Sequence, residues 1–175
     1  MMKEKGVWDL LEACKLLKEK QYKYYCNFVG KWSDITKEEF TSKVLELGLQ
    51  NEVNGAGAKY GNEKKVFFEN ADVLVFPTFY HGETFGLVLL EAMEYALPCI
   101  STNEGGIPSV ISDGETGILV DKRSPMELAD KLIYLIEHPD LCISMGKSGK
   151  ERFLKEFTLE SFEKRLVAIL NDCIS

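Results

Sequence analysis

The sequence DVLVFPTFYHGETFGLVLLEAMEYALPCIST, residues 72–102, contains a long, almost wholly apolar segment between two short apolar runs. The first run, residues 73–76, has no polar interruption, which is typical of a central parallel strand covered on both faces. A glycine-containing loop follows, and then a helix that we expect over residues 84–97. Ligands of open α/β sheets bind beyond the carboxyl ends of the strands. We therefore expect the chemistry of this protein in the loop, residues 78–86.

The rest of the chain repeats this pattern, because short apolar runs alternate with longer amphipathic segments almost throughout. That alternation is typical of βαβ units and predicts an α/β protein with a doubly wound, mostly parallel, Rossmann-like sheet. We expect strands at five places: residues 22–29, near Val53, and residues 72–77, 98–102 and 117–120.

Two helix starts follow from residue types at fixed spacing. Thr36 with Glu39, and Ser124 with Glu127 behind Pro125, have the spacing of capping boxes. Each predicts the start of a helix. After the second box no further strand is expected, and the chain should end in helices over residues 125–137, 139–153 and 158–173.

Length and composition predict one globular domain over residues 1–175, since 45% of the residues are hydrophobic and 28% are charged. The formal net charge of -7 argues against a broad nucleic-acid or anionic-membrane surface, which would need clustered Lys and Arg. Any phosphate must therefore be held locally. No apolar run approaches the roughly 18 residues of a membrane span.

The cysteines indicate a reduced, cytoplasmic protein. There are five, an odd number, and they are scattered without a CxxC pair or a histidine at zinc-finger spacing. Nor does the start resemble a signal peptide, because Asp9 and Glu12 interrupt its apolar stretch.

The start of the helix after the loop is a candidate anion site. If Glu83 or Thr84 caps this helix, the amides of Phe85, Gly86 and Leu87 become unpaired donors at its positive end. Gly86 would let a phosphate approach the backbone closely. An ordinary capped core helix is an equal alternative on these residues alone.

Glu91 lies inside the same apolar helix, where a charge is costly unless it has a partner. A pair of ribose hydroxyls would be such a partner. The alternative is that Glu91 and Glu94 share one solvated face. Glu83 and Glu91 would be separated by a rise of roughly 12 Å in a continuous helix, comparable to the reach from a sugar across a diphosphate to a ribose.

Glu83, seven intervening residues and Glu91 resemble the EX7E signature of the group 1 glycosyltransferases, which are retaining enzymes with two Rossmann-like domains (the GT-B fold). The whole stretch 71–120 resembles the donor-binding part of that family, and KG at 5–6, FVG at 28–30 and FTLESF at 157–162 also fit. The resemblance implies the second, C-terminal domain of the fold, which binds the nucleotide sugar, with the N-terminal acceptor domain absent.

The resemblance also implies roles for single residues. Glu83 would lie beside the donor sugar and the reacting centre. Phe85 and Gly86, with Leu87 after them, would supply amides to the diphosphate. Glu91 would accept hydrogen bonds from the ribose.

Further implied site residues lie outside the helix. Lys5 matches the family lysine that neutralises the diphosphate, although a solvated lysine is the alternative reading of the charged run at 3–5. Gly57 is read as a loop glycine beside the base. Ala96 stands where a helix-ending glycine is usual, and a left-handed alanine there would cost roughly 1 kcal/mol.

By resemblance, the function would be retaining transfer from a UDP-sugar or GDP-sugar in polysaccharide or glycolipid assembly. No metal or other cofactor is expected. Alternatives are a nucleotide-sugar-binding module without turnover and an inactive fragment of a split enzyme. The expected partners are the donor, the absent acceptor domain and a second copy, reached through an apolar stripe on the last helix; nucleic acid is not expected. The full-length enzyme would be cytoplasmic, with a peripheral position at the inner face of the membrane as a further option.

The resemblance leads to one structural expectation about the centre of the sheet. In the strand order 3-2-1-4-5-6 the first strand lies between the second and the fourth. The family places that strand immediately before the loop that ends in KG, and only residues 1–4 precede the KG at 5–6 here, so we expect the strand to be missing. A gap should then separate residues 22–29 from residues 72–77. These strands would pair directly, or another chain would fill the gap, or the domain would be marginally stable.

Overall fold

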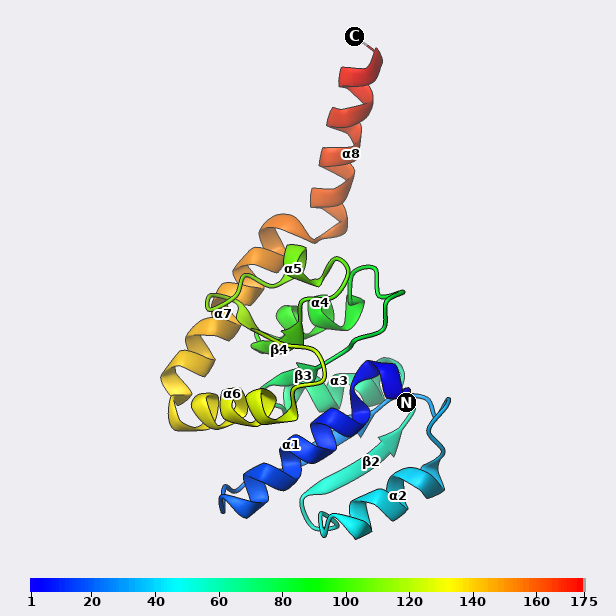
Figure 1. Ribbon diagram of the computed structural model, residues 1–175. Coiled ribbons are helices and arrows are strands. Elements are labelled where there is room, and N and C mark those ends of the chain that lie inside the picture. Colours follow the sequence, from blue (N-terminus) through cyan, green and yellow to red (C-terminus); the bar gives the residue numbers. More distant parts are fainter. Residues whose placement is uncertain (175) are drawn as a thin grey trace.

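The computed structural model describes residues 1–174, which form an α/β fold with short strands surrounded by helices (Figure 1). All five expected strand positions are confirmed, although the first and third strands are shorter than expected. The strands are β1 (Cys26–Val29), β2 (Val53–Gly57), β3 (Leu74–Phe76), β4 (Cys99–Thr102) and β5 (Gly117–Val120).

The helices lie between the strands and continue beyond the last one, as the pattern predicts. They are η1 (Lys3–Lys5), α1 (Val7–Glu19), α2 (Lys37–Glu46), α3 (Gly61–Glu69), α4 (Leu87–Glu94), α5 (Ile107–Val110), α6 (Pro125–Glu137), α7 (Pro139–Glu156) and α8 (Leu159–Ile174).

The strands form two parallel sheets rather than one. One sheet has the order β1-β2 and the other β3-β4-β5. Within residues 1–174 no ladder joins β1 to β3, so the expected gap is present and direct pairing of these strands does not occur. β3 is consequently an edge strand, and its residues are half-buried instead of covered on both faces.

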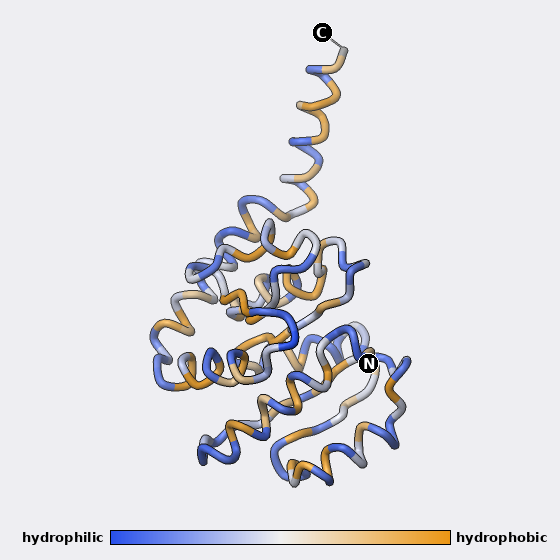
Figure 2. The backbone as a smooth tube through the Cα atoms, viewed as in Figure 1, coloured by the Kyte–Doolittle hydropathy of each residue, from blue (hydrophilic) through white to orange (hydrophobic). Residues whose placement is uncertain are grey.

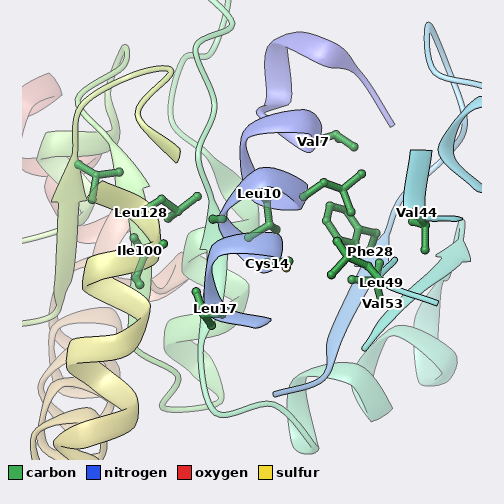
Figure 3. Packing of buried hydrophobic residues seen from close by; sticks show 14 of the residues in the cluster. Val7, Leu10, Cys14, Leu17, Phe28, Val44, Leu49, Val53, Ile100 and Leu128 are labelled. Atoms are coloured by element: carbon green, nitrogen blue, oxygen red, sulfur yellow. The ribbon is translucent and has the colours of Figure 1, made fainter. Parts of the chain in front are cut away.

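Helix α1 joins the two sheets into one core. Leu10 and Leu17 of α1 belong to the same buried cluster as Phe28 of β1, Ile100 of β4 and Leu128 of α6. Figure 3 shows α1 between the first strand and the α6 side of the molecule. Apolar burial against this helix thus links the sheets where strand pairing does not.

One of the two predicted capping boxes is confirmed and the other is wrong. Thr36 Oγ1 accepts the Glu39 amide, and the Glu39 carboxylate accepts the Thr36 amide. Ser124 occupies the N-cap position of α6, but its side chain makes no capping bond. The Glu127 carboxylate instead accepts the amide of Asp121 in the preceding turn.

Helix α4 begins three residues later than predicted. Its N-cap is Gly86, whose φ of 70° is left-handed, so neither Glu83 nor Thr84 starts the helix. The chain before it forms a turn, and Thr84 O accepts the amide of Gly106 from the loop after β4. At the other end Ala96 has a φ of 57°, the left-handed conformation expected of it.

Helix α8 extends away from the rest of the molecule (Figures 1 and 2). It presents a series of exposed apolar side chains, which Figure 2 shows as hydrophobic segments along the helix. They are Leu159, Phe162, Leu166, Val167, Ile169 and Leu170.

Within residues 1–174, no helix combines the length and the apolar character that crossing a membrane would require.

Candidate functional site

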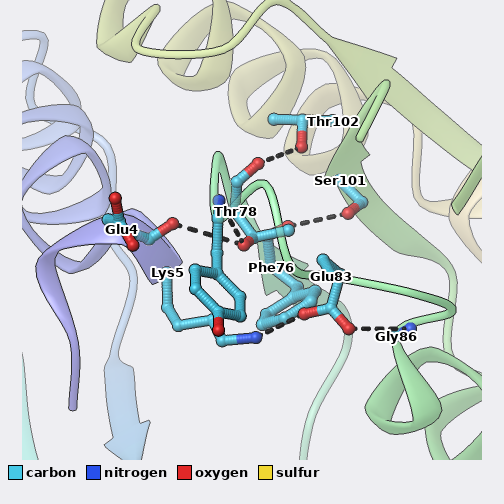
Figure 4. A network of polar contacts seen from close by, with 9 residues as sticks. Glu4, Lys5, Phe76, Thr78, Glu83, Gly86, Ser101 and Thr102 are labelled. Atoms are coloured by element: carbon cyan, nitrogen blue, oxygen red, sulfur yellow. Dashed lines mark hydrogen bonds and ion pairs between the residues drawn. The ribbon is translucent and has the colours of Figure 1, made fainter. Parts of the chain in front are cut away.

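The loop after β3 is fixed on two sides by hydrogen bonds. On one side, the amide of Phe79 and the hydroxyl of Thr78 donate to the carbonyl of Glu4, at 2.8 and 3.3 Å. On the other, Thr102 Oγ1 of β4 donates to the carbonyl of Thr78, which is fully buried (Figure 4). The loop is therefore held between η1 and the carboxyl end of the sheet.

Gly6 brings η1 against the end of β3. Its φ is 74°, and a Cβ at this position would lie 2.2 Å from the carbonyl oxygen of Pro77. Only glycine combines this conformation with such a close approach. The preceding residue, Lys5, is thereby placed over the loop.

The Lys5 ammonium lies among aromatic rings and a carboxylate. It is 5.2 Å from the ring centroid of Phe76 and 5.0 Å from that of Tyr80, within the range of a cation–π interaction. It also forms an ion pair with Glu83 Oε2 (Figure 4). Lys5 is thus held in place and is not the freely solvated lysine of the alternative reading.

Glu83 connects Lys5 to the start of α4. Its Oε1 accepts the amide of Gly86 at 3.1 Å, while Oε2 contacts Lys5. The expectation that the Gly86 amide is an unpaired donor is therefore wrong. Leu87 is the first residue of α4, so the helix contains no earlier carbonyl that could accept its amide.

The loop after β4 packs directly on the loop that carries Glu83. A Cβ at Gly105 would lie 1.8 Å from Glu83 O, and one at Gly106 would lie 2.3 Å from Thr84 O. Because these two glycines have no side chains, the backbone of the loop after β4 can pack against the backbone of Glu83 and Thr84. This contact restrains the position of Glu83.

Glu91 is paired with a lysine that the sequence analysis did not identify. Lys64 Nζ lies 2.6 Å from each carboxylate oxygen of Glu91, and the side chains of the two residues are 33% and 43% exposed. Glu94 is exposed, so the two glutamates of α4 have different surroundings. No spacing links Lys64 to Glu91, because they are 27 residues apart on different helices.

Gly57 belongs to the other sheet. It is the last residue of β2, has a φ of 70°, and its carbonyl accepts the amide of Gly30 at 2.9 Å. A residue with a side chain would have an unfavourable backbone conformation at this position, and its Cβ would lie 3.5 Å from Trp32 Nε1. Helix α3, which carries Lys64, follows from this strand end.

A second ion pair beside the loop was also missed. Lys122 Nζ lies 2.5 Å from Glu104 Oε2, and the hydrogen bond from Lys122 lowers the pKa of Glu104. The nearby His81 is an exposed loop residue, with its ring against Tyr80 at 5.6 Å between centroids. In the described part of the chain, no three His, Cys, Asp or Glu side chains are grouped as metal ligands.

Apart from Gly57, which lies in the other sheet, the predicted residues lie in two charged clusters. Lys5, Glu83 and Gly86 lie together beyond the end of β3, with Phe85 and Leu87 adjacent in the chain. Glu91 lies further along α4 with Lys64. A cation, a carboxylate and the amides of a helix start are side by side, which is suited to binding an anionic group with polar substituents.

Comparison with known proteins identifies relatives of this chain. Residues 1–152 match the family described as glycosyl transferases group 1. The capsular polysaccharide biosynthesis glycosyltransferase CapM of Staphylococcus aureus is 29% identical over 98% of this chain and 44% of its own length.

Solved structures share the fold. The C-terminal domain of the group 1 glycosyl transferase LpcC of Francisella tularensis has a TM-score of 0.77 and 28% identity, over 91% of this chain and 83% of that one. HepE of Anabaena, in complex with UDP, has a TM-score of 0.87 and 20% identity, over 98% of this chain and 46% of that one.

The fold is accordingly that of the C-terminal domain of GT-B glycosyltransferases. The chain spans less than half the length of the curated relatives that it matches. Because the family match covers residues 1–152 of 175, the chain belongs to the group 1 glycosyltransferases.

Proposed function

We propose that this chain binds the nucleotide diphosphate sugar donor for glycosyl transfer with retention, on the surface formed by η1, the loop 78–86 and the start of α4. The observation that carries the proposal is the contact of Lys5 and the Gly86 amide with one carboxylate, Glu83. A cation and a helix-start amide converge on the same point, which is what a diphosphate requires.

The catalytic contribution follows from where charge develops. As the bond from the sugar to the diphosphate breaks, negative charge grows on the departing diphosphate. The ammonium of Lys5 and the amides of Phe85, Gly86 and Leu87 would stabilise that charge, and they are already in position before the reaction. Metal ions are not needed for this role, because the cation and the amides supply the positive charge.

Glu83 would then act on the sugar side. In the structure it accepts hydrogen bonds from the two groups that we assign to the diphosphate. Donor binding must therefore give Lys5 and Gly86 a new anionic partner. The carboxylate of Glu83 would be released toward the sugar hydroxyls and the reacting carbon.

Glu91 would bind the nucleoside. Two carboxylate oxygens can accept both hydroxyls of a ribose diol, and the half-exposed position of Glu91 leaves it accessible. The structure of HepE contains UDP, which supports a nucleoside diphosphate as the ligand here; UDP-sugars and GDP-sugars are the two donor classes that we propose. The relative CapM is a capsular polysaccharide biosynthesis enzyme, which supports a role in polysaccharide or glycolipid assembly.

Calorimetry with UDP, GDP and pyrophosphate tests the proposal. The wild-type chain should bind UDP or GDP weakly, in the presence of EDTA as well as without it. Lys5→Gln should weaken binding of both the nucleotide and pyrophosphate about tenfold, since one charge-assisted contact is lost. Lys3→Gln is the matched control, because Lys3 is an exposed lysine of the same η1 turn, and it should have little effect.

The same chain should not transfer sugar to an acceptor at a substantial rate. Closure of an active site over the donor requires protein on both sides of it. This chain spans less than half the length of its relatives. Absence of any binding by the wild-type chain, or equal losses from the Lys3 and Lys5 variants, would contradict the proposal. Binding without transfer, even after an acceptor domain is supplied, would favour a module without turnover.

A further inference from the structure

Lys64 and Glu91 form an ion pair whose geometry has a consequence for ligand binding. The Lys64 ammonium is 2.6 Å from both Glu91 oxygens, so it lies between them and uses one lone pair of each. It also lies 5.6 Å from the ring centroid of Phe68 on the same helix. The ammonium therefore covers the edge of the carboxylate where both oxygens can be reached together.

A vicinal diol would need this same edge. Two hydroxyl groups on neighbouring carbons donate most readily to both oxygens of one carboxylate from the side that the two oxygens share. The ammonium and the diol are thus alternative partners of Glu91, although a carboxylate has about four lone-pair sites in all.

We propose that Lys64 is a specificity-determining residue of the nucleotide site, which competes with the ribose diol for Glu91 and is displaced when a ribonucleotide binds. This inference rests on the proposed function of Glu91. Its substance is the competition for one edge of the carboxylate: a diol that takes the edge shared by the two Glu91 oxygens displaces Lys64 from it, whereas binding of phosphate alone leaves the Lys64–Glu91 pair intact.

Packing supports a role for Lys64 other than holding the helices together. Phe68 of α3 is buried in the same apolar cluster as Leu89 and Met93 of α4, so α3 and α4 are joined by side chains beneath the ion pair. Ion pairs as exposed as this one contribute little to folding. Neutralising Lys64 should therefore leave the fold intact and change only the partners available to Glu91.

The test compares Lys64→Gln with Lys65→Gln, the exposed lysine next to it on α3. Calorimetry would give the affinities for UDP and 2′-deoxy-UDP, and for GDP and 2′-deoxy-GDP. The readout is the ratio of ribonucleotide to deoxyribonucleotide affinity. Loss of a positive charge near a polyanion weakens both members of a pair alike and so cancels in this ratio.

We expect Lys64→Gln to raise the ratio about twofold to fivefold, the usual strength of an exposed ion pair that no longer has to be broken. Lys65→Gln should leave the ratio unchanged. In a Glu91→Gln background, Lys64→Gln should have no effect on it, because the contested carboxylate is gone.

An unchanged ratio in Lys64→Gln would show that Lys64 does not meet the ribose, and a lowered ratio would show that it orients Glu91 for the ribose. Either result overturns the competition while the wild-type chain still binds nucleotide. A wild-type chain that binds none of the four nucleotides would overturn the proposed function, and the inference with it.

Discussion

Glu83 and Glu91 are each held by a lysine from a distant segment. Lys5 and Glu83 are 78 residues apart, and Lys64 and Glu91 are 27 apart. Glu83 and Glu91 were predictable from their places in the EX7E motif, and Lys5 from the KG pair at 5–6. Neither pairing could be predicted, because nothing in local spacing records which segments the tertiary structure brings together.

The different surroundings of the two glutamates predict different effects of their replacement. Glu91→Ala should weaken UDP or GDP binding about tenfold, since it removes the proposed ribose contact. Glu83→Ala should leave affinity for the bare nucleoside diphosphate within about twofold, because Lys5 and the Gly86 amide become free for phosphate. It should instead remove any gain that the sugar brings to binding or any slow hydrolysis of the donor. Titrations with UDP and UDP-glucose separate the effects, and equal losses for UDP in both variants would show that the roles are wrongly assigned.

Ala96 gives a prediction about stability that is independent of the site. Its φ of 57° is left-handed, so Ala96→Gly should raise the free energy of unfolding by about 1 kcal/mol. Ala13→Gly is the matched control with the opposite sign, because Ala13 lies within α1 at an ordinary helical position and glycine there should lower stability by a similar amount or more. Urea unfolding of both variants measures the difference. A loss of stability in Ala96→Gly would contradict the account of this helix end.

The secondary-structure elements were predictable in position, but only some of them in length: β5 and α6 have the predicted bounds, whereas β1 and β3 are shorter. Apolar runs indicated four of the strands, and a single valine, Val53, indicated the fifth, yet the predicted strand at 22–29 forms a ladder only from Cys26 onward. Tyr25 is 64% exposed, and the partner strand β2 begins at the level of Cys26. A strand can form ladder hydrogen bonds only as far as its neighbouring strand extends. The apolar sequence of residues 22–29 does not show where that neighbour begins.

Helices α2 and α6 begin where predicted, but the capping of α6 and the start of α4 differ from the prediction, for a similar reason. Glu127 has the spacing of a capping residue but bonds to the amide of Asp121 instead of the start of α6. Glu83 has the position of a cap for α4, but it binds Lys5 and the Gly86 amide, and the helix begins later. A carboxylate near a helix start has several possible partners, and tertiary contacts select among them.

The exposed apolar side chains of helix α8 indicate that two copies of this chain associate with each other. Its exposed apolar side chains include Leu159 at 87% and Phe162 at 58%, and they continue along one stripe to Leu170. Burial of such a stripe between two copies is favourable in water. We expect sedimentation equilibrium to show association at high protein concentration, and Leu166→Lys to weaken it at least tenfold. Lys164→Gln, on the opposite side of the helix, should not weaken the association. A wild-type chain that stays monomeric at the same concentrations would contradict the prediction.

At the scale of the whole molecule, two separate sheets are joined by helices and by the first residues of the chain. The carbonyl of Met1 accepts the amide of Ser33 after β1, and that of Glu4 accepts the amide of Phe79 after β3. The N-terminal residues therefore bridge the carboxyl ends of both sheets, where the proposed donor site lies.

The most direct test of this account is to map where a nucleoside diphosphate touches the chain. Amide chemical shifts of the isotope-labelled protein would be followed during titration with UDP, and separately with GDP. We predict the largest changes at Phe85, Gly86 and Leu87 and around Lys5, with smaller changes along α4 near Glu91. Saturation with either nucleotide that leaves these amides unmoved, or that shifts only residues elsewhere in the fold, would contradict it.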